Sequence, residues 1–338
     1  MIRTSHYLFA ALCLGSLFAC SRQFTDSYIV PKWCFAVFML FIVLAYEAVN
    51  ILFYRQNEQK DTRISVYGFI IVISCFLQAM FGVVQFFGFF QISTTLWVTG
   101  SFDNPAGFAA CLCAGFPFVG FLLSDSNKYI RYVGGLIGFV IVIAVILSQS
   151  RAGIMSIAFI CFILLNMKFF HKRWVKYLSL LCFALLLSGC YWMKKDSADG
   201  RLLIWRCSVS MVKDAPWLGH GIGSFEARYM DYQADYFRQY GLNRYSMLAD
   251  NVKHPFNEYL GVLLNFGFVG LLMILALITL LIYCYKKHPC AEKRIAFCSL
   301  ISIGVFSFFS YTFTYPFTWI VTFLCIIILT KEYIAKVF

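Results

Sequence analysis

The stretch Tyr259–Tyr285, YLGVLLNFGFVGLLMILALITLLIYCY, contains no charged residue and is followed directly by Lys286 and Lys287. A helix needs about 20 apolar residues to cross the hydrocarbon core of a bilayer. This stretch is long enough, and a basic pair at its end is typical of a membrane-spanning helix. It therefore predicts a membrane protein.

The composition of the whole chain agrees with this prediction. The 338 residues are 61% hydrophobic and only 13% charged, with a mean hydropathy of +0.76. Soluble domains are about 45–50% apolar and about 25% charged. The excess excludes a soluble enzyme, a disordered protein and a secreted disulfide scaffold. The 14 cysteines lie almost entirely in apolar runs without CxxC or Cys/His spacing, so we expect neither a metal site nor a cofactor.

Apolar runs of this kind recur along the chain, and together they predict an all-α, polytopic integral membrane protein of about ten transmembrane helices. The first run could be a retained span or the core of a signal peptide, and both alternatives stay open. The ten runs are Tyr7–Cys20, Trp33–Tyr54, Ile64–Phe90, Ala106–Leu123, Ile130–Leu147, Ala152–Phe170, Val175–Met193, Tyr259–Tyr285, Ile295–Thr312 and Phe317–Thr330.

Basic residues in the short loops indicate the orientation, because loops on the cytoplasmic side are enriched in Lys and Arg. With the N-terminus inside, the short outer loops hold only Arg22, Lys32 and Arg151. Both termini are then cytoplasmic. The basic residues on the inner side are Arg55, Lys60, Arg63, Lys128, Arg131, Lys168, Lys172, Arg173, Lys176, Lys286, Lys287, Lys293, Arg294, Lys331 and Lys336.

This topology predicts three parts: residues 1–193 as a bundle of about seven spans, residues 194–258 as an outer loop domain, and residues 259–338 as about three spans. The loop domain lies between spans 7 and 8. The net charge of +12 follows from the basic loops, so we expect the bilayer as a partner and no nucleic acid.

The outer segment is nearly neutral, with nine basic and eight acidic residues, so a topology signal does not explain its charges. Two stripes at helical spacing predict two helices in it. The tyrosine stripe is typical of a membrane interface, and stacking against sugars is the alternative. The stripes are Leu202, Trp205, Val209 and Val212, then Phe225, Tyr229, Tyr232, Tyr236 and Tyr240.

The turn between these two helices contains the pattern GxGxG at Gly219–Gly223. No strand precedes it and no βαβ unit surrounds it, so it is not a dinucleotide fingerprint. The chain contains no Walker A motif either, and we expect no use of ATP.

Two patches at the predicted outer face contain unusual polar residues at the ends of apolar runs. In Gly100–Phe108, the pair Asn104-Pro105 is a helix start that either shapes a site or only caps the helix. In Ser148–Gly153, Arg151 stands beside hydrocarbon, where an ionisable group is a functional candidate. Snorkelling to the lipid headgroups is the alternative. The small neighbours of Arg151, including Gly153, would let an anionic group approach closely.

A third patch, Lys253–Leu260, lies where the outer segment re-enters the membrane. His254 can act as an acid or a base near neutral pH. Asn257 and Glu258 fall in the first turn of the helix that follows. The alternative is an interfacial helix cap with a solvated histidine.

These patches resemble, in the same order, the motifs of the O-antigen ligase / O-antigen polymerase (Wzy-like) superfamily of bacterial envelope glycosyltransferases. The resemblance covers about Phe102 to Leu272 and includes the long outer loop in its expected place. The matching stretches are Gly100–Phe108, Ser150–Gly153, Gly200–Trp205 with Pro216–Phe225, and His254–Leu260 followed by Asn265–Leu272.

The resemblance implies a metal-independent glycosyltransferase of lipopolysaccharide or polysaccharide biosynthesis. It would act at the periplasmic face of the bacterial inner (cytoplasmic) membrane, and its donor would be a glycan on undecaprenyl pyrophosphate. Its acceptor would be lipid A-core for a ligase, another lipid-linked glycan for a polymerase, or a protein hydroxyl for a protein O-oligosaccharyltransferase.

Carried over residue by residue, the resemblance assigns the donor pyrophosphate to Arg151 and Arg201 and the activation of the acceptor to His254. Many members of the family have a second His just before the Asn, where this chain has Phe256. For this reason His220 stays an alternative base and Glu258 a further catalytic candidate. Asn104, Pro105, Gly153, Gly221, Gly223 and Asn257 are expected to shape the site.

Two other classes of function remain as alternatives. A transporter or flippase of lipid-linked sugars usually shows internal repeats and charges at the membrane midplane. Here no repeat is visible, and the main polar residues inside the runs are Glu47, Gln78 and Gln85. The second alternative is an envelope scaffold without chemistry.

Overall fold

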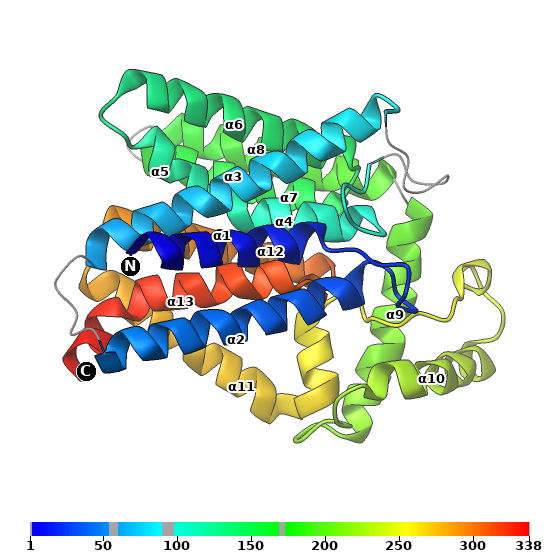
Figure 1. The fold of residues 1–338 in the computed structure, drawn as a ribbon. Helices are drawn as coiled ribbons and strands as arrows, with labels where there is room; N and C mark the ends of the chain where they lie inside the picture. The colour runs from blue at the N-terminus through cyan, green and yellow to red at the C-terminus, as the bar shows by residue number, and fades with distance from the viewer. Residues whose placement is uncertain (1, 54–59, 90–97, 169–172, 194, 338) are drawn as a thin grey trace. The chain divides into compact units, whose positions relative to one another are not determined.

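The computed structural model describes residues 2–53, 60–89, 98–168, 173–193 and 195–337 (Figure 1). These residues form helices and loops, and no strand occurs among them. The helices are α1 (Ile2–Phe18), α2 (Ile29–Phe53), α3 (Lys60–Phe86), α4 (Pro105–Gly115), η1 (Phe116–Phe118), α5 (Val119–Leu123), α6 (Lys128–Leu147), α7 (Arg151–Lys168), α8 (Arg173–Met193), α9 (Lys195–Asp214), α10 (Ser224–Tyr240), η2 (Ser246–Leu248), α11 (Glu258–Lys287), α12 (Ala291–Phe309), η3 (Thr312–Thr314) and α13 (Pro316–Val337).

The all-α prediction is confirmed for the described residues, and each predicted apolar run falls mainly on helical residues among them. Tyr54, Phe90 and residues 169–170 of these runs lie outside the described residues. Six stretches in these ranges are long and apolar enough to cross a membrane, and they lie on α2, α3, α4 to α5, α6, α11 and α13. The other four predicted runs fall on α1, α7, α8 and α12. The count of about ten spans stays a prediction.

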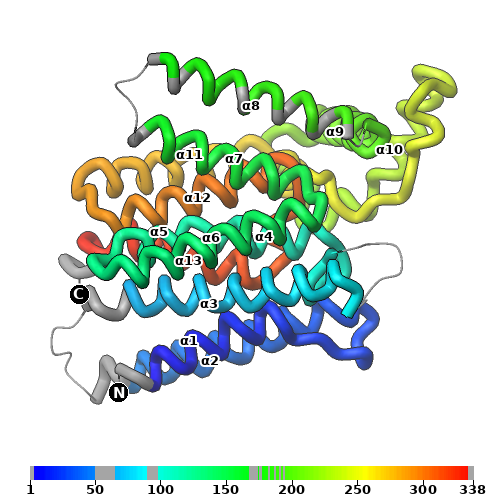
Figure 2. The backbone as a smooth tube through the Cα atoms, turned by 90° about the horizontal axis from the view of Figure 1, so that it is seen from above, coloured from blue at the N-terminus to red at the C-terminus, as the bar shows by residue number. Residues whose placement is uncertain are grey.

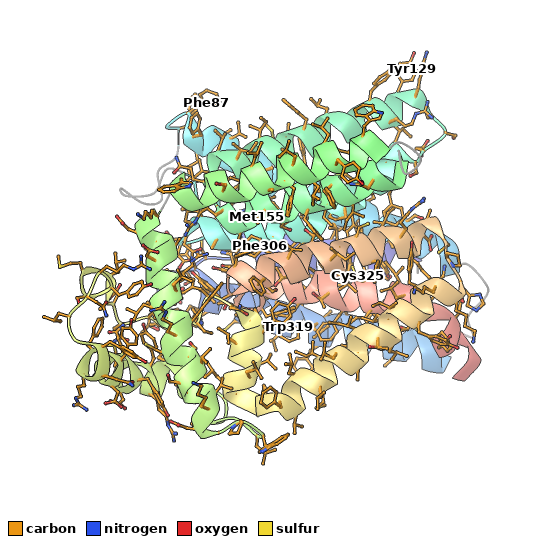
Figure 3. All side chains as sticks on the ribbon, turned by 180° about the vertical axis from the view of Figure 1, so that it is seen from behind. Phe87, Tyr129, Met155, Phe306, Trp319 and Cys325 are labelled. Atoms are coloured by element: carbon orange, nitrogen blue, oxygen red, sulfur yellow. The ribbon has the colours of Figure 1, made fainter. Side chains whose placement is uncertain are left out.

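Large apolar side chains point outward along the spanning helices. On α2, for example, Phe38 is 63% exposed and Phe41 is 69% exposed. In Figure 3, Phe87 and Tyr129 project from the surface, and their exposed fractions are 70% and 68%. Exposed apolar surface on this scale is unfavourable in water and favourable against lipid. The described helices therefore have the surface of a membrane protein.

The chain packs as two compact units. The first contains residues 1–160, 284–304 and 312–338, and the second contains residues 161–283 and 305–311. In the first unit, α1 packs against α2, α3 and α13, and Figure 2 shows α1, α2 and α3 as neighbours. These units reflect packing within the chain. The predicted division at residues 193 and 258 concerns membrane crossing and stays a prediction.

Serine hydroxyls link three helices in the core of the first unit. Ser302 Oγ on α12 donates to Cys113 O on α4 at 2.7 Å and lies 2.7 Å from Ser156 Oγ on α7. Ser299 Oγ also donates to α4, to the carbonyl of Ala114 at 2.7 Å. Small residues let helix backbones approach closely in a membrane, and their hydroxyls bond across the interface. These hydrogen bonds therefore link α12 to α4 on one side and to α7 on the other.

A buried polar loop precedes α4 in the first unit. Gln85 Oε1 on α3 accepts hydrogen bonds from the backbone N–H groups of Thr99 and Gly100, at 2.9 and 2.8 Å. Ser101 Oγ lies 3.1 Å from Gln78 Oε1 and donates to Leu17 O. Backbone groups buried away from water need such partners. The two glutamines inside the apolar runs therefore hold this loop.

In the second unit, α9 and α10 confirm the two helices predicted in the outer segment. Phe225 and Tyr229 are buried in their shared core, so these two residues of the tyrosine stripe face α9. Of the other predicted stripe, Leu202 and Val209 are exposed, whereas Trp205 and Val212 are partly buried and pack against this core. The side of α9 that packs in this core carries Leu203, Ile204, Cys207 and Met211.

Helix α11 breaks at Gly267, where φ is +60° and ψ is −157°, and Figure 1 shows the change of direction. The break leaves backbone groups without intrahelical partners, and the Pro216–Gly221 turn supplies them. Leu264 O and Asn265 O accept from the N–H groups of His220 and Gly221 at 2.7 and 3.1 Å.

On the other side of the break, the N–H groups of Phe268 and Val269 donate to Pro216 O and Trp217 O at 2.8 and 3.2 Å. The two segments thus exchange hydrogen bonds in both directions. A Cβ at Gly267 would overlap the backbone of Trp217, and a Cβ at Gly219 would lie 2.6 Å from the backbone of Phe266. Only glycine fits at both positions.

Replacing Gly267 by Ala should therefore destabilise the second unit. The left-handed backbone alone costs about 1–3 kcal/mol for a residue with a Cβ, and the overlap adds to this. We expect a clear fall in the melting temperature of the detergent-solubilised protein. The matched control is Gly135→Ala on α6, where a Cβ meets nothing within 4 Å. Equal melting of Gly267→Ala and the wild type would contradict the role assigned to the break.

Candidate functional site

Arg201 lies in the first half of α9 and is partly buried. Its Nη1 donates to the carbonyl of Phe309 at 2.7 Å, where α12 ends. Its guanidinium also lies over the ring of Phe256, with its carbon 5.1 Å from the ring centroid. A planar guanidinium fixed at one edge and stacked on an aromatic face keeps a defined orientation.

Phe256 is part of an aromatic chain that joins Arg201 to His254. The Phe256 ring meets the Tyr311 ring edge-on at 5.3 Å, and Tyr311 in turn stacks on His254 at 4.5 Å with an interplanar angle of 21°. The structure thus brings together two of the residues assigned from the sequence, Arg201 and His254. We refer to Arg201, His254, Phe256 and Tyr311 as the aromatic cluster.

The segment that carries His254 is fixed on both sides. Trp205 Nε1 on α9 donates to Pro255 O at 3.0 Å. Asn257, which is buried, caps α11, because its Oδ1 accepts from the N–H groups of Tyr259 and Leu260 at 3.0 and 3.2 Å. Glu258 is the first residue of α11, where a carboxylate interacts favourably with the helix dipole.

His220 has a different environment. Its Nε2 lies 2.7 Å from Met211 O, and a carbonyl oxygen only accepts, so this nitrogen carries the proton. Its Nδ1 then accepts from Arg228 Nη1 at 3.0 Å. Both ring nitrogens are therefore engaged within the protein. This arrangement favours a structural role for His220 in the turn that meets α11.

The glycines of this turn serve its backbone. Gly221 has φ +90°, and its N–H donates to Asn265 O. Gly223 has φ +79° and precedes α10 at the capping position. A residue with a Cβ would be strained at either position. The geometry supports a shaping role for both glycines in the second unit.

In the first unit, Asn104 caps α4 and Pro105 begins it. Asn104 Oδ1 accepts from Gly107 N–H at 2.9 Å and from the hydroxyl of buried Tyr315 at 3.2 Å. A Cβ at Gly107 would come 2.5 Å from the Tyr315 ring. The Asn-Pro pair thus has the capping role that its sequence predicts, and Asn104 also ties α4 to the start of α13.

Arg151 is the first residue of α7 and is partly buried. Ser150 Oγ caps this helix, accepting from Gly153 N–H at 3.3 Å. A Cβ at Gly153 would lie 2.8 Å from Val145 Cγ1 and 2.9 Å from Ala109 Cβ. The side of Gly153 that lacks a Cβ therefore faces other helices, and its smallness lets α7 pack closely on α4 and α6.

The backbone is strained in the segment before Arg151 and in the segment after His254. Among the described residues, the non-glycine residues with positive φ are Gln149, at +52°, and Phe256, at +51°. One stands two residues before Arg151 and the other two residues after His254. Such conformations are unfavourable for residues with a Cβ and concentrate at functional sites. The strain marks each segment, within its own unit, as a functional candidate.

Sequence reasoning missed Tyr311 and the carbonyl of Phe309. Both belong to the junction between α12 and α13, where Ser310–Pro316 reads SYTFTYP. The junction lies outside the three polar patches that the sequence indicates, and its first residues belong to the predicted apolar run Ile295–Thr312. Its density of hydroxyl and aromatic residues before a proline was the available signal.

No three His, Cys, Asp or Glu side chains of the described residues come together in an arrangement that could hold a metal ion. The cysteines whose side chains are described are free thiols.

The chain was compared with known families and proteins. Residues 136–275 match the family model described as O-antigen ligase, Wzy_C. This region contains Arg151, Arg201, His220 and the His254–Glu258 segment, whereas Asn104 and Pro105 lie before it. No curated protein matches the chain. The match over residues 136–275 supports the resemblance of this part of the chain to the O-antigen ligase/polymerase superfamily.

Proposed function

We propose that the chain transfers a glycan from undecaprenyl pyrophosphate to an acceptor hydroxyl at the periplasmic face of the bacterial inner membrane. The family match supports a ligase or polymerase type of activity. The observation that carries the residue-level proposal is the aromatic cluster, which holds a guanidinium and an imidazole on one chain of stacked rings.

Arg201 is proposed to bind the donor pyrophosphate. As the bond between the anomeric carbon and the pyrophosphate oxygen breaks, negative charge grows on the leaving group. A fixed guanidinium stabilises this charge, and it binds phosphate oxygens with parallel N–H donors. The bond from Arg201 to Phe309 O uses one of its five N–H donors and sets the plane of the fork.

His254 is proposed to activate the acceptor. Its imidazole takes the proton from the acceptor hydroxyl while the oxygen attacks the anomeric carbon, and undecaprenyl pyrophosphate leaves. The ring is held on one face by Tyr311, which limits its rotation. Glu258 begins the adjacent helix and stays a further catalytic candidate. No metal is required in this scheme, because Arg201 supplies the positive charge.

The transporter alternative is less well supported. Of the three main polar residues inside the apolar runs, Gln85 accepts from the loop backbone and Gln78 lies against Ser101 in the same loop. These side chains thus serve the packing of the first unit. A scaffold without chemistry would not need strained backbone beside Arg151 and His254.

The acceptor class separates the remaining alternatives. Lipid A-core would make the protein a ligase, a second lipid-linked glycan would make it a polymerase, and a protein hydroxyl would make it a protein O-oligosaccharyltransferase. Supplying each acceptor in turn to the purified protein with a lipid-linked donor distinguishes the three activities.

We predict that both termini are cytoplasmic and that residues 194–258 are periplasmic. In a variant without the exposed native cysteines Cys20, Cys34 and Cys290, Met247→Cys should react with a membrane-impermeant thiol reagent in intact spheroplasts. Ser126→Cys, in the loop before α6, should react only after lysis. The reverse pattern would overturn the orientation.

Replacing Arg201 by Ala should abolish transfer in a glycan-ladder assay. Arg201→Lys should restore only part of the activity, because an ammonium keeps the charge and loses the planar fork. Arg151→Ala tests the same assignment for Arg151. The control is Arg131→Ala, at an exposed position of α6. Full activity of Arg201→Ala and Arg151→Ala, with unchanged expression, would exclude both residues from pyrophosphate binding.

Replacing His254 by Ala should lower turnover by about 10²–10⁴-fold, the usual contribution of general base catalysis. Binding of the lipid-linked donor should persist, because the variant leaves Arg201 in place. His220→Ala should mainly lower the melting temperature, since it removes bonds to Met211 O and Arg228. Wild-type turnover in His254→Ala with loss of turnover in a stable His220→Ala would move the role to His220.

A further inference from the structure

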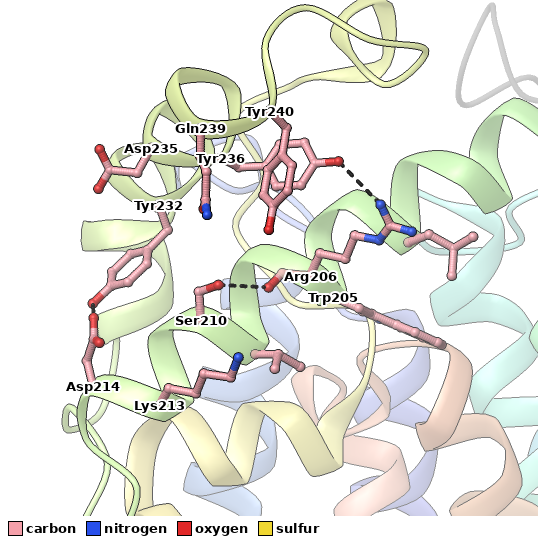
Figure 4. A pocket seen from close by; sticks show the side chains of 12 residues that line it. Trp205, Arg206, Ser210, Lys213, Asp214, Tyr232, Asp235, Tyr236, Gln239 and Tyr240 are labelled. Carbon is pink, nitrogen blue, oxygen red and sulfur yellow. Dashed lines mark hydrogen bonds between the residues drawn. The ribbon is translucent and has the colours of Figure 1, made fainter.

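A pocket of about 700 Å³ lies between α9 and α10, outside the aromatic cluster. Figure 4 shows side chains of α10 directed across it toward α9. Its volume falls in the range of about 300–1,000 Å³ that is typical of small-ligand sites. The exposed apolar side chains of α9, Leu202 and Val209, line it.

Aromatic rings form one wall of the pocket. Tyr232, Tyr236 and Tyr240 follow one another at four-residue intervals along α10, so they lie on one face of the helix. The rings of Tyr236 and Tyr240 are 4.9 Å apart, and Tyr240 is 61% exposed. Exposed tyrosine faces offer an apolar platform with a hydrogen-bonding rim.

Hydrogen bonds hold this wall in place before any ligand arrives. The hydroxyl of Tyr232 donates to Asp214, and this bond raises the pKa of Tyr232 to about 12, so the hydroxyl stays protonated. Arg206 Nη1 donates to the hydroxyl of Tyr236 at 3.3 Å. A wall that is already ordered loses little entropy on binding.

Two polar side chains of the pocket are not used in this way. Lys213 of α9 and Gln239 of α10 are exposed and have no hydrogen bond or ion pair with another described residue. They offer an ammonium group and an amide that can donate and accept. The pocket therefore combines aromatic faces with free hydrogen-bonding groups at its rim.

Sugars present the complementary surface, because one face of a pyranose ring is rich in C–H groups and its edge carries hydroxyls. Contact with lipid fits less well, because Arg206, Lys213, Asp214 and Asp235 also line the pocket and charges are costly in hydrocarbon. Insertion of this pocket into hydrocarbon is thus disfavoured, while a position at the membrane interface, where charged side chains are tolerated, stays an alternative for the tyrosine stripe.

We propose that the pocket between α9 and α10 binds sugar units of the glycan that the protein transfers or extends. This inference rests on the proposed function. Trp205 connects the two sites, since it lines the pocket and donates to Pro255 O, next to His254. Sugars held here would lie beside the reacting end and would position the chain, while Arg201 binds the pyrophosphate.

The test uses the full-length protein in nanodiscs and a probe without lipid or pyrophosphate, the oligosaccharide released by mild acid from the lipid-linked glycan of the source cell. Binding is measured by titration. Gln239→Ala, Lys213→Ala and Tyr240→Ala should each weaken binding by about tenfold, the effect of one lost hydrogen bond or stacking contact. The matched control is Asp231→Ala, an exposed position of α10 outside the pocket, which should bind as the wild type does.

A second comparison separates this proposal from the proposed function. Arg201→Ala should abolish transfer and leave binding of the carrier-free oligosaccharide unchanged, whereas the pocket variants should raise the KM for the lipid-linked donor. Binding of the oligosaccharide that depends on Gln239 and Lys213 would support the pocket even if no transfer were found. No binding by the wild type, or equal binding by the pocket variants and Asp231→Ala, would overturn it.

Discussion

The exchange of backbone hydrogen bonds between the Pro216–Gly221 turn and the break in α11 determines the arrangement of the second unit. Unpaired backbone groups are costly in an apolar environment, by several kcal/mol each in hydrocarbon. A candidate spanning helix can break at Gly267 only because the turn supplies four partners. The same bonds fix the end of α9 and the start of α10 against α11. One contact thus positions both α10, which forms a wall of the pocket, and α11, which follows the segment with His254.

That contact also explains why glycines occupy the GxGxG pattern at Gly219–Gly223. A glycine-rich turn at a helix start often suggests phosphate binding, but here the glycines permit close approach of two backbones and a left-handed turn. Gly219 meets the backbone of α11, while Gly221 donates to it. His220 lies between them with both ring nitrogens engaged. His220, which the family resemblance left as an alternative base, is thus also part of this structural junction.

The sequence predicted most of the helices, because apolar length and helical periodicity are local properties of the chain. The pattern of α9 did not indicate which of its faces packs in the protein core, for a reason that is not local. Leu202, Trp205 and Val209 form a regular stripe, but they line the pocket, whereas Leu203, Cys207 and Met211 pack in the core. Periodicity shows that a helix has an apolar face and does not show whether protein or a ligand covers it.

The candidate site shows the same limit of prediction from sequence. His254 and Arg201 were identified from their segments, yet their proximity depends on Tyr311 and on the carbonyl of Phe309, which are far away in the sequence. The left-handed backbone at Phe256 carries no signature in the residue type, since it results from contacts that hold the segment from several sides. These features require the folded chain.

Two of the basic residues used to predict the orientation of the chain, Lys32 and Lys293, are buried in the structure. Lys32 counted as a basic residue of a short outer loop, but its side chain is buried, with Nζ donating to Ser101 O at 2.8 Å and lying 4.8 Å from the Phe102 ring centroid. Lys293, counted on the inner side, is equally buried and pairs with Glu332 at 3.2 Å. The positive-inside rule counts basic residues in short loops near the ends of the spans, whatever their burial in the folded protein, so both lysines stay in the count. Their burial shows that a residue which serves as a topology signal during insertion can also take a packing role in the folded protein, and the orientation itself stays a prediction.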